Sequence, residues 1–244
     1  MATEYPSTFA GGPQPVRVYL PPCYDETGAP YPVLFLLAGN IHDESKWDEL
    51  GLDEAATELI ASGEIPPLVV VMPDGGWMAN NTSGGPGSYE SVILEDLLPW
   101  VEKAYCVRRD AAGRAIGGLS RGGYWALEIA FRHPERFASV GGHSAALLDT
   151  HAGPTINPRQ TALTQDLGAL RVYLDIGADD YLRANTIELH EKMAAGGVPH
   201  TWILQEGRHE DAYWAENIET YLRWYAEPWA GALEESSGCD ASHS

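Results

Sequence analysis

The stretch Gly117-Gly118-Leu119-Ser120-Arg121-Gly122-Gly123 stands where an apolar run ends and an amphipathic run begins. Residues 115–119 have the pattern of a buried strand, and residues 124–130 have the pattern of the helix that follows it. A serine with glycine two residues away on each side fits a sharp strand-to-helix turn, because a side chain at either glycine would collide with the neighbouring strand and helix. The stretch predicts a nucleophile elbow that lifts the Ser120 hydroxyl clear of the sheet.

Short apolar runs alternate with amphipathic segments along the rest of the chain. The runs that predict buried strands cover residues 33–37, 68–72, 115–119, 138–142, 172–176 and 202–204. Helical spacing covers residues 52–60 and 94–101, a helix capped by Asn185 and a last helix over 215–225. Repeated strand–helix units predict an α/β-hydrolase fold, with a mostly parallel central sheet and helices on both faces. Residues 16–20 alternate apolar and polar, which predicts a half-exposed antiparallel strand at the sheet edge.

The length and composition fit one domain. A chain of 244 residues, 44% of them hydrophobic, can bury one large core. We expect a single domain over residues 1–230 and a disordered tail over 231–244, where small polar residues show no periodicity. Only 35 residues separate Ser144 from Asp180, and a predicted strand lies among them, so we expect no large lid domain.

The charge and the cysteines exclude several classes of partner. A formal net charge of −20 repels nucleic-acid phosphates and anionic lipid surfaces, so we expect neither nucleic acid nor membrane as a partner. The amino terminus lacks the basic and apolar regions of a secretory signal, which predicts a cytoplasmic location unless a signal has been removed. The cysteines Cys23, Cys106 and Cys239 show no C-x-x-C spacing, so we expect no metal and no cofactor. A homo-oligomer is compatible with all of these features.

A serine nucleophile needs a general base, and the base needs a carboxylate that fixes its tautomer. In this fold the chain order is serine, acid, histidine. His209 lies between the last predicted strand and the last helix, at the carboxyl edge of the sheet where ligands bind, so we predict that it is the base. For the acid, Asp175 lies within a strand, whereas Asp179 and Asp180 both lie in the loop that follows. Spacing alone leaves these last two open.

Three motifs resemble a known family. They are Gly-Leu-Ser-Arg-Gly-Gly at 118–123, Asp-Ile-Gly-Ala-Asp-Asp at 175–180 and Gln-Glu-Gly-Arg-His at 205–209. Together they resemble the putative esterase family, which includes feruloyl esterases, enterochelin-type esterases, S-formylglutathione hydrolases and mycolyltransferases, and the resemblance covers roughly residues 16–225. In that family the acid closes a Gly-x-x-Asp motif, and the resemblance therefore implies that Asp180 is the acid.

An ester carbonyl under attack develops an oxyanion that needs two N–H donors. The residue after the nucleophile supplies one, which predicts the backbone amide of Arg121. Residues 36–41 resemble the Leu-Leu-His-Gly segment of the family, and the resemblance implies the backbone amide of Asn40 as the second donor. Ala38 stands where the family often has histidine, but a backbone donor does not depend on that side chain.

Aromatic and histidine residues near the predicted edge are candidates for binding the substrate. They are His42, Trp47, Trp77, His143 and Trp214. For each tryptophan, burial in the core is the alternative.

These residues predict the hydrolysis of a small-molecule carboxylic ester by Ser120, His209 and Asp180 through an acyl-enzyme intermediate. Transfer of the acyl group to another acceptor would use the same residues. A non-catalytic binding protein on this scaffold is a third hypothesis, and the presence of serine, acid and histidine in the expected order disfavours it.

Overall fold

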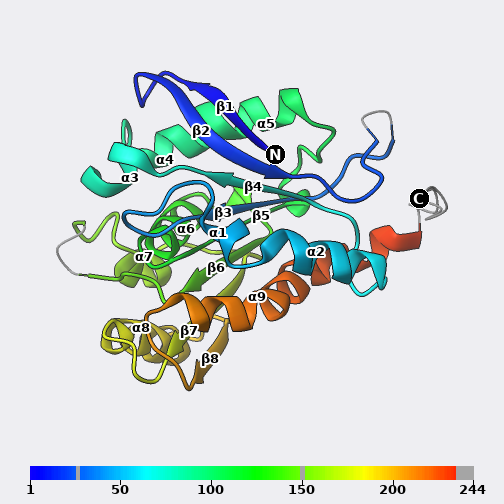
Figure 1. Cartoon of the computed structure of the whole chain (residues 1–244). Coiled ribbons are helices and arrows are strands. Elements are labelled where there is room, and N and C mark those ends of the chain that lie inside the picture. Colours follow the sequence, from blue (N-terminus) through cyan, green and yellow to red (C-terminus); the bar gives the residue numbers. More distant parts are fainter. Residues whose placement is uncertain (26–27, 149–151, 235–244) are drawn as a thin grey trace.

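The computed structural model describes residues 1–25, 28–148 and 152–234 and has an eight-stranded sheet at its centre (Figure 1). The strands are β1 (Ala2–Ser7), β2 (Gly12–Tyr19), β3 (Val33–Leu37), β4 (Val69–Pro73), β5 (Arg114–Leu119), β6 (Ser139–His143), β7 (Arg171–Gly177) and β8 (Thr201–Gln205). Their spatial order is β1-β2-β4-β3-β5-β6-β7-β8, and β3 to β8 run parallel. The predicted mostly parallel sheet is confirmed.

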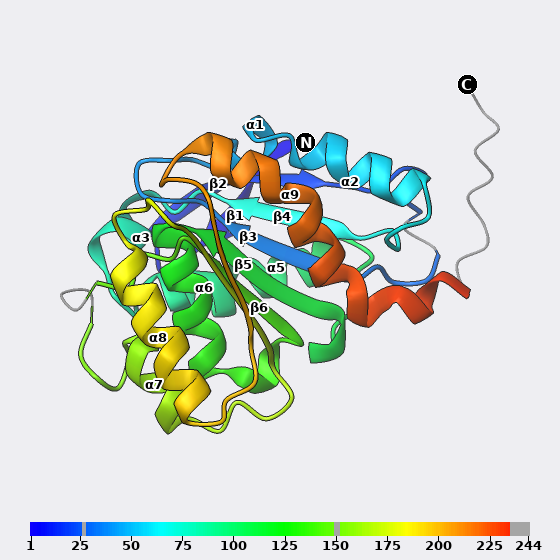
Figure 2. The ribbon, with the colours of Figure 1, turned by 90° about the horizontal axis from the view of Figure 1, so that it is seen from below.

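Helices cover both faces of this sheet. They are α1 (Lys46–Glu49), α2 (Leu52–Ala61), α3 (Gly76–Asn81), α4 (Tyr89–Ser91), a π-helical segment η1 (Val92–Leu97), α5 (Leu98–Ala104), α6 (Arg121–Arg132), α7 (Pro158–Thr164), α8 (Arg183–Ala195) and α9 (Asp211–Ala226), with 3₁₀ turns η2 (Ala111–Gly113), η3 (Pro134–Arg136) and η4 (Glu227–Glu234). Helices α2 and α9 lie on one face, whereas α6, α7 and α8 lie on the other (Figure 2). The described residues show no large lid over the carboxyl edge.

The side chains of β3 show why its sequence is apolar throughout. Leu34 and Leu36 pack in the core beneath α2 and α9, whereas Phe35 and Leu37 pack in the core beneath α5 and α6. All five residues of β3 are buried. A parallel strand covered on both faces needs apolar residues at every position, and this explains the continuous runs.

Two elements differ from the sequence-based expectations. Residues 16–20 were expected to form the sheet edge, but β2 is covered by β1, which pairs with it in antiparallel register. Pro6 lies within β1, and proline is tolerated in an edge strand because a missing donor can face outward there. Asn185 does not cap α8, because the helix begins at Arg183 and Leu182 is its N-cap.

Four residues of the predicted tail belong to a described helical turn. Residues 231–234 belong to η4, and residues 235–244 of the predicted disordered tail lie outside the described residues. The single domain over residues 1–230 stays a prediction. Among the described helices, none combines the length and the apolar character that crossing a bilayer requires. The expected cellular location stays a prediction.

A buried glutamate in α6 should make stability depend on pH. Glu128 is fully buried, and burial together with the nearby negative charge of Glu90 raises its pKa well above the ordinary value of 4.5. The native state therefore holds a proton that the unfolded chain releases above pH 4.5, so the free energy of unfolding declines as the pH rises from there. We expect Glu128→Gln to flatten this decline, measured by urea unfolding between about pH 5 and pH 8.

The matched control for this change is Glu58→Gln, which replaces an exposed glutamate on α2. It should leave the pH dependence of the parent intact. An equal slope in the parent and the Glu128→Gln variant would contradict the prediction.

Candidate active site

Ser120 lies in a sharp turn between β5 and α6. Its backbone has φ 55° and ψ −118°, a region that non-glycine residues rarely occupy. A Cβ atom on Gly118 would lie 2.4 Å from the carbonyl carbon of Gly122, and one on Gly122 would lie 2.2 Å from the carbonyl oxygen of Leu37. Both glycines are therefore required by close backbone approach, as the sequence pattern predicts.

Ser120, His209 and Asp180 form one continuous chain of hydrogen bonds. The Ser120 Oγ lies 2.9 Å from His209 Nε2, and His209 Nδ1 lies 2.8 Å from Asp180 Oδ2. A carboxylate beside Nδ1 keeps the proton on that nitrogen, which leaves Nε2 free to accept the serine proton. Asp180 is 1% exposed, and its second oxygen accepts the backbone N–H of Leu182 at 2.7 Å.

The geometry also separates the three aspartates that were considered as the acid. Asp180 alone among them bonds to His209 in the described chain. The Asp179 side chain is 70% exposed and lies 4.0 Å from Arg183, at the limit of an ion pair. Asp175 is buried and binds His143 instead.

The two candidate amides flank Ser120. The N–H of Arg121 lies in the first turn of α6, where backbone donors have no acceptor within the helix. Asn40 lies in a turn that is closed by the His42 N–H and the Gly39 carbonyl at 3.2 Å, so the turn itself does not use the Asn40 N–H. A Cβ on Gly39 would lie 3.3 Å from the Ser120 Cβ, which places this turn directly against the elbow.

The side chain of Arg121 has a role that the sequence did not indicate. It is buried, and its Nε–H donates to the carbonyl of Ala79 at 2.9 Å while a terminal nitrogen donates to the carbonyl of Thr82. The guanidinium also lies over the rings of Tyr124 and Trp125, at 4.6 and 5.1 Å from their centroids. Arg121 thus fixes the end of α3 to the start of α6.

The five candidate substrate contacts separate into exposed and buried residues. Trp77 is 69% exposed and His42 is half-buried, and burial and the charge of Lys46 lower the pKa of His42. The other three side chains do not reach the surface, and their contact with substrate stays a prediction. Trp47 is buried and donates to the Leu37 carbonyl at 3.1 Å, His143 is fully buried, and Trp214 is buried with its ring edge-on to His209 at 5.0 Å.

Two exposed apolar residues at the site were not anticipated. Ile41 follows Asn40, is 89% exposed and has φ 62°, which is strained for a β-branched residue. Tyr181 follows Asp180, is 76% exposed, and its ring centroid lies 4.8 Å from that of His209. Ile41 and Tyr181 come from two different loops, and Trp77, on α3, is a third exposed apolar side chain. The sequence gives one indication of Ile41 and Tyr181, which is their position directly after the predicted site residues Asn40 and Asp180.

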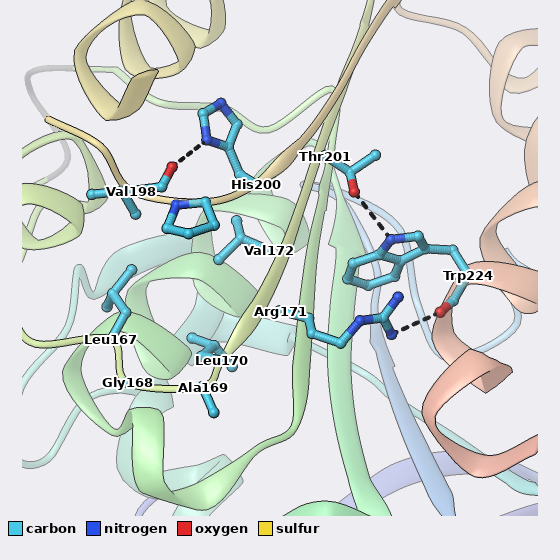
Figure 3. Close-up of a pocket in the computed structure, with 11 residues that line it drawn as sticks. Leu167, Gly168, Ala169, Leu170, Arg171, Val172, Val198, His200, Thr201 and Trp224 are labelled. Carbon is cyan, nitrogen blue, oxygen red and sulfur yellow. Dashed lines mark hydrogen bonds between the residues drawn. The ribbon is translucent and has the colours of Figure 1, made fainter. Parts of the chain in front are cut away.

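A cavity of about 450 Å³ lies elsewhere, at the amino ends of β7 and β8 (Figure 3). Ser120, Asp180 and His209 follow the carboxyl ends of strands, so this cavity is at the opposite edge of the sheet. Its charged side chain, Arg171, is paired with Glu227 and lies 4.4 Å over the ring of Trp224. The cavity is therefore separate from the candidate active site.

The sequence is similar to those of known proteins. A family model described as "Putative esterase" matches residues 7–225. An esterase of Mycobacterium tuberculosis is 35% identical over 167 residues, which cover 65% of this chain and 35% of that protein. An endo-1,4-beta-xylanase/feruloyl esterase of Xylanibacter ruminicola is 30% identical over 226 residues, which cover 87% of this chain and 29% of that protein. The chain thus spans about a third of the length of these curated relatives.

A solved structure of a ferulic acid esterase is similar along nearly its whole length. It superposes with a TM-score of 0.85 at 26% identity, covering 93% of this chain and 98% of the other. The family match covers residues 7–225, and the fold and the elbow at Ser120 are consistent with it. The chain therefore belongs to the putative esterase family, a family of carboxylic-ester hydrolases.

Proposed function

We propose that the protein hydrolyses carboxylic esters with Ser120 as nucleophile, His209 as general base and Asp180 as the acid that orients the base. The observation that carries this proposal is the unbroken hydrogen-bond chain from Ser120 Oγ through both nitrogens of His209 to Asp180. The family and its named esterases support the same reaction class.

The reaction follows from this arrangement in two halves. The Ser120 Oγ attacks the ester carbonyl carbon and passes its proton to His209 Nε2, while the carbonyl electron pair moves to an oxyanion held by the Asn40 and Arg121 amides. The intermediate collapses, the C–O bond to the alcohol breaks, and the alcohol takes the proton from Nε2. Water then attacks the acyl-enzyme, gives a proton to Nε2, and collapse releases the acid while Nε2 returns the proton to Ser120 Oγ.

An apolar or aromatic group next to the carbonyl fits the surroundings of Ser120. Ile41, next to Asn40, and Tyr181, against His209, expose apolar surface at the site, and Trp77 is exposed on α3, the helix that the Arg121 side chain holds. Exposed apolar surface at a site marks a binding surface. The ferulic acid esterase among the similar structures carries a name that fits such a group. We propose aryl esters of the hydroxycinnamate type as the substrate class.

Labelling with a fluorophosphonate tests the nucleophile directly. The probe should modify the folded protein at Ser120, identified by mass spectrometry of the peptide. Ser144 is an internal control, because it is fully buried and should stay unmodified. Folded protein that takes up no label, or takes it up on a different serine, would overturn the proposed mechanism.

Trp77→Ala should lower kcat/KM for esters of large acyl groups and leave it nearly unchanged for esters of small ones. Removing an aromatic contact of this size should lower kcat/KM for methyl ferulate about tenfold, because partial burial of an indole is worth about 1–2 kcal/mol. For methyl acetate, which is too small to reach the indole, we expect a change below about twofold. Both rates can be followed in a pH-stat, and equal losses for the two esters would remove Trp77 from the binding surface.

Acyl transfer remains an alternative with the same three residues. The exposed surroundings of Ser120 would admit an alcohol as well as water. Product analysis in the presence of alcohol acceptors distinguishes the two reactions, and formation of the free acid alone would exclude transfer to those acceptors.

A further inference from the structure

Five buried polar residues form a cluster between the sheet and α9. His143, the last residue of β6, lies with its Nδ1 2.7 Å from Asp175 Oδ1 on β7. The hydroxyls of Tyr213 and Tyr221 donate to Asp175 Oδ2, each at 2.8 Å. The hydroxyl of Tyr225 lies 3.0 Å from His143 Nε2. We refer to these five residues as the His143 cluster.

Filling this space with polar groups is energetically less favourable than filling it with apolar side chains. Burying a carboxylate costs several kcal/mol, which the three bonds to Asp175 must offset, whereas apolar side chains would fill the same space without that cost. Tyr225 also needs room in the sheet, because a Cβ on Gly117 or Gly141 would lie 1.9 Å from its hydroxyl oxygen. Two neighbouring strands therefore carry glycine to admit one hydroxyl. Stability alone explains such an arrangement poorly.

The backbone of the cluster holds the elbow. The carbonyl of His143 accepts the N–H of Ser120 at 2.9 Å, and the carbonyl of Asp175 accepts the N–H of Ser144 at 3.0 Å. The N–H of Ala146 in turn donates to the carbonyl of Ser120 at 2.9 Å. The backbone N–H of Ser120 is thus bonded to the last residue of β6, and its carbonyl to the segment that follows β6. A residue with a strained φ keeps its conformation only where its surroundings hold it. For Ser120, the bonds to His143 and Ala146 tie this conformation to the cluster.

The other side of the cluster supports the loop of His209. A Cβ on Gly207 would lie 2.3 Å from the ring of Tyr213, so that ring packs directly against the loop. The carbonyl of Gly207 accepts the N–H of Asp179 at 3.0 Å, which joins this loop to the one that carries Asp180. The bond from Tyr213 to Asp175 therefore links the His209 loop to the strand that precedes Asp180.

We propose that the His143 cluster fixes the distance between Ser120 Oγ and His209 Nε2, by tying the elbow and the His209 loop to one buried carboxylate. His143, Asp175, Tyr213 and Tyr221 are then positioning residues, since they are buried and act through the backbone. This inference rests on the proposed function. A misplacement of about 1 Å in a catalytic group can cost about 100-fold in rate, so a smaller shift from the loss of one hydroxyl should cost about tenfold.

The test removes single hydroxyls with little change in shape. Tyr213→Phe and Tyr221→Phe each delete one donor to Asp175, and Tyr173→Phe is the matched control. Tyr173 is buried with its ring centroid 5.7 Å from that of His143, and within the described chain no bond joins its hydroxyl to Asp175. We expect kcat and the rate of fluorophosphonate labelling to fall about tenfold in both test variants, with KM within about twofold. The control should retain both rates within about twofold.

The rates are measured well below the melting temperature, so that loss of stability cannot imitate loss of positioning. Test variants that melt earlier yet keep kcat within about twofold would overturn the proposal and leave the cluster a purely structural one. As a rescue, His143→Asn keeps a donor near the position of Nδ1 and should retain more labelling activity than His143→Ala; equal rates in these two variants would also contradict it. If the parent protein takes no label, the proposed function itself fails.

Discussion

Replacing Ser120 with alanine is expected to lower kcat for an aryl ester by at least about 10⁴-fold, because the proposed acyl-enzyme forms on the Ser120 Oγ. The loss should appear in kcat, since the proposed nucleophile takes part in bond formation and contributes little to ground-state binding. The loss in kcat is measured by steady-state hydrolysis of p-nitrophenyl acetate, with the variant at high enzyme concentration.

The folded structure should survive this substitution. The Ser120 side chain bonds to His209, whereas the elbow itself is held by backbone bonds and by the packing of its glycines. The melting temperature should therefore stay within a few degrees of the parent value. A variant that stays folded and keeps even a tenth of the parent rate would rule out Ser120 as the nucleophile.

Asp180→Asn is expected to lower kcat by about 10⁴-fold through the tautomer of His209. The carboxylate accepts two N–H groups, one from His209 and one from Leu182, on different oxygens. An amide has a single oxygen, so it cannot accept both bonds in the same orientation, and at 1% exposure little water can replace the lost acceptor. The ring would then turn its protonated nitrogen towards Ser120 and lose its function as a base.

Asp179→Asn is the matched control for this change. Asp179 is the neighbouring residue in the same loop, but its side chain is 70% exposed and forms at most a weak ion pair with Arg183. The Asp179→Asn variant should therefore keep kcat within about twofold of the parent value. Comparable losses in the two variants would show that the loop, rather than the carboxylate of Asp180, is what matters.

The fold could be predicted from the sequence because its signals are local. A strand covered on both faces must be apolar throughout, and the elbow must carry glycine. The sequence pattern therefore predicts β3, β5 and α6. The edge strand β1 was missed, because an exposed strand with a proline has neither signal. Asn185 is a good capping residue in general, but here α8 starts two residues earlier.

The burial of the substrate-contact candidates could not be predicted in the same way. His143 follows an apolar strand, as a site residue would, but its partner Asp175 is 32 residues away and the tyrosines are still farther along the chain. Sequence does not show which distant hydroxyls will converge on one carboxylate. Nor does it show that Ile41 adopts a left-handed conformation, because isoleucine disfavours that region.

The glycines around Ser120 also set limits on changing this protein by design. Gly118 and Gly122 are confined by backbone, whereas Gly117 is confined by the hydroxyl of Tyr225, more than 100 residues later. A library that randomises residues 117–123 would lose most of its members to collisions, and varying position 225 with it would relieve only the collisions at Gly117. A Gly117→Ala change needs a residue smaller than phenylalanine at position 225, because the new Cβ would also lie 2.7 Å from the ring carbon Cζ of Tyr225. Diversity aimed at new substrates is better directed to Ile41, Trp77 and Tyr181, whose side chains extend into solvent.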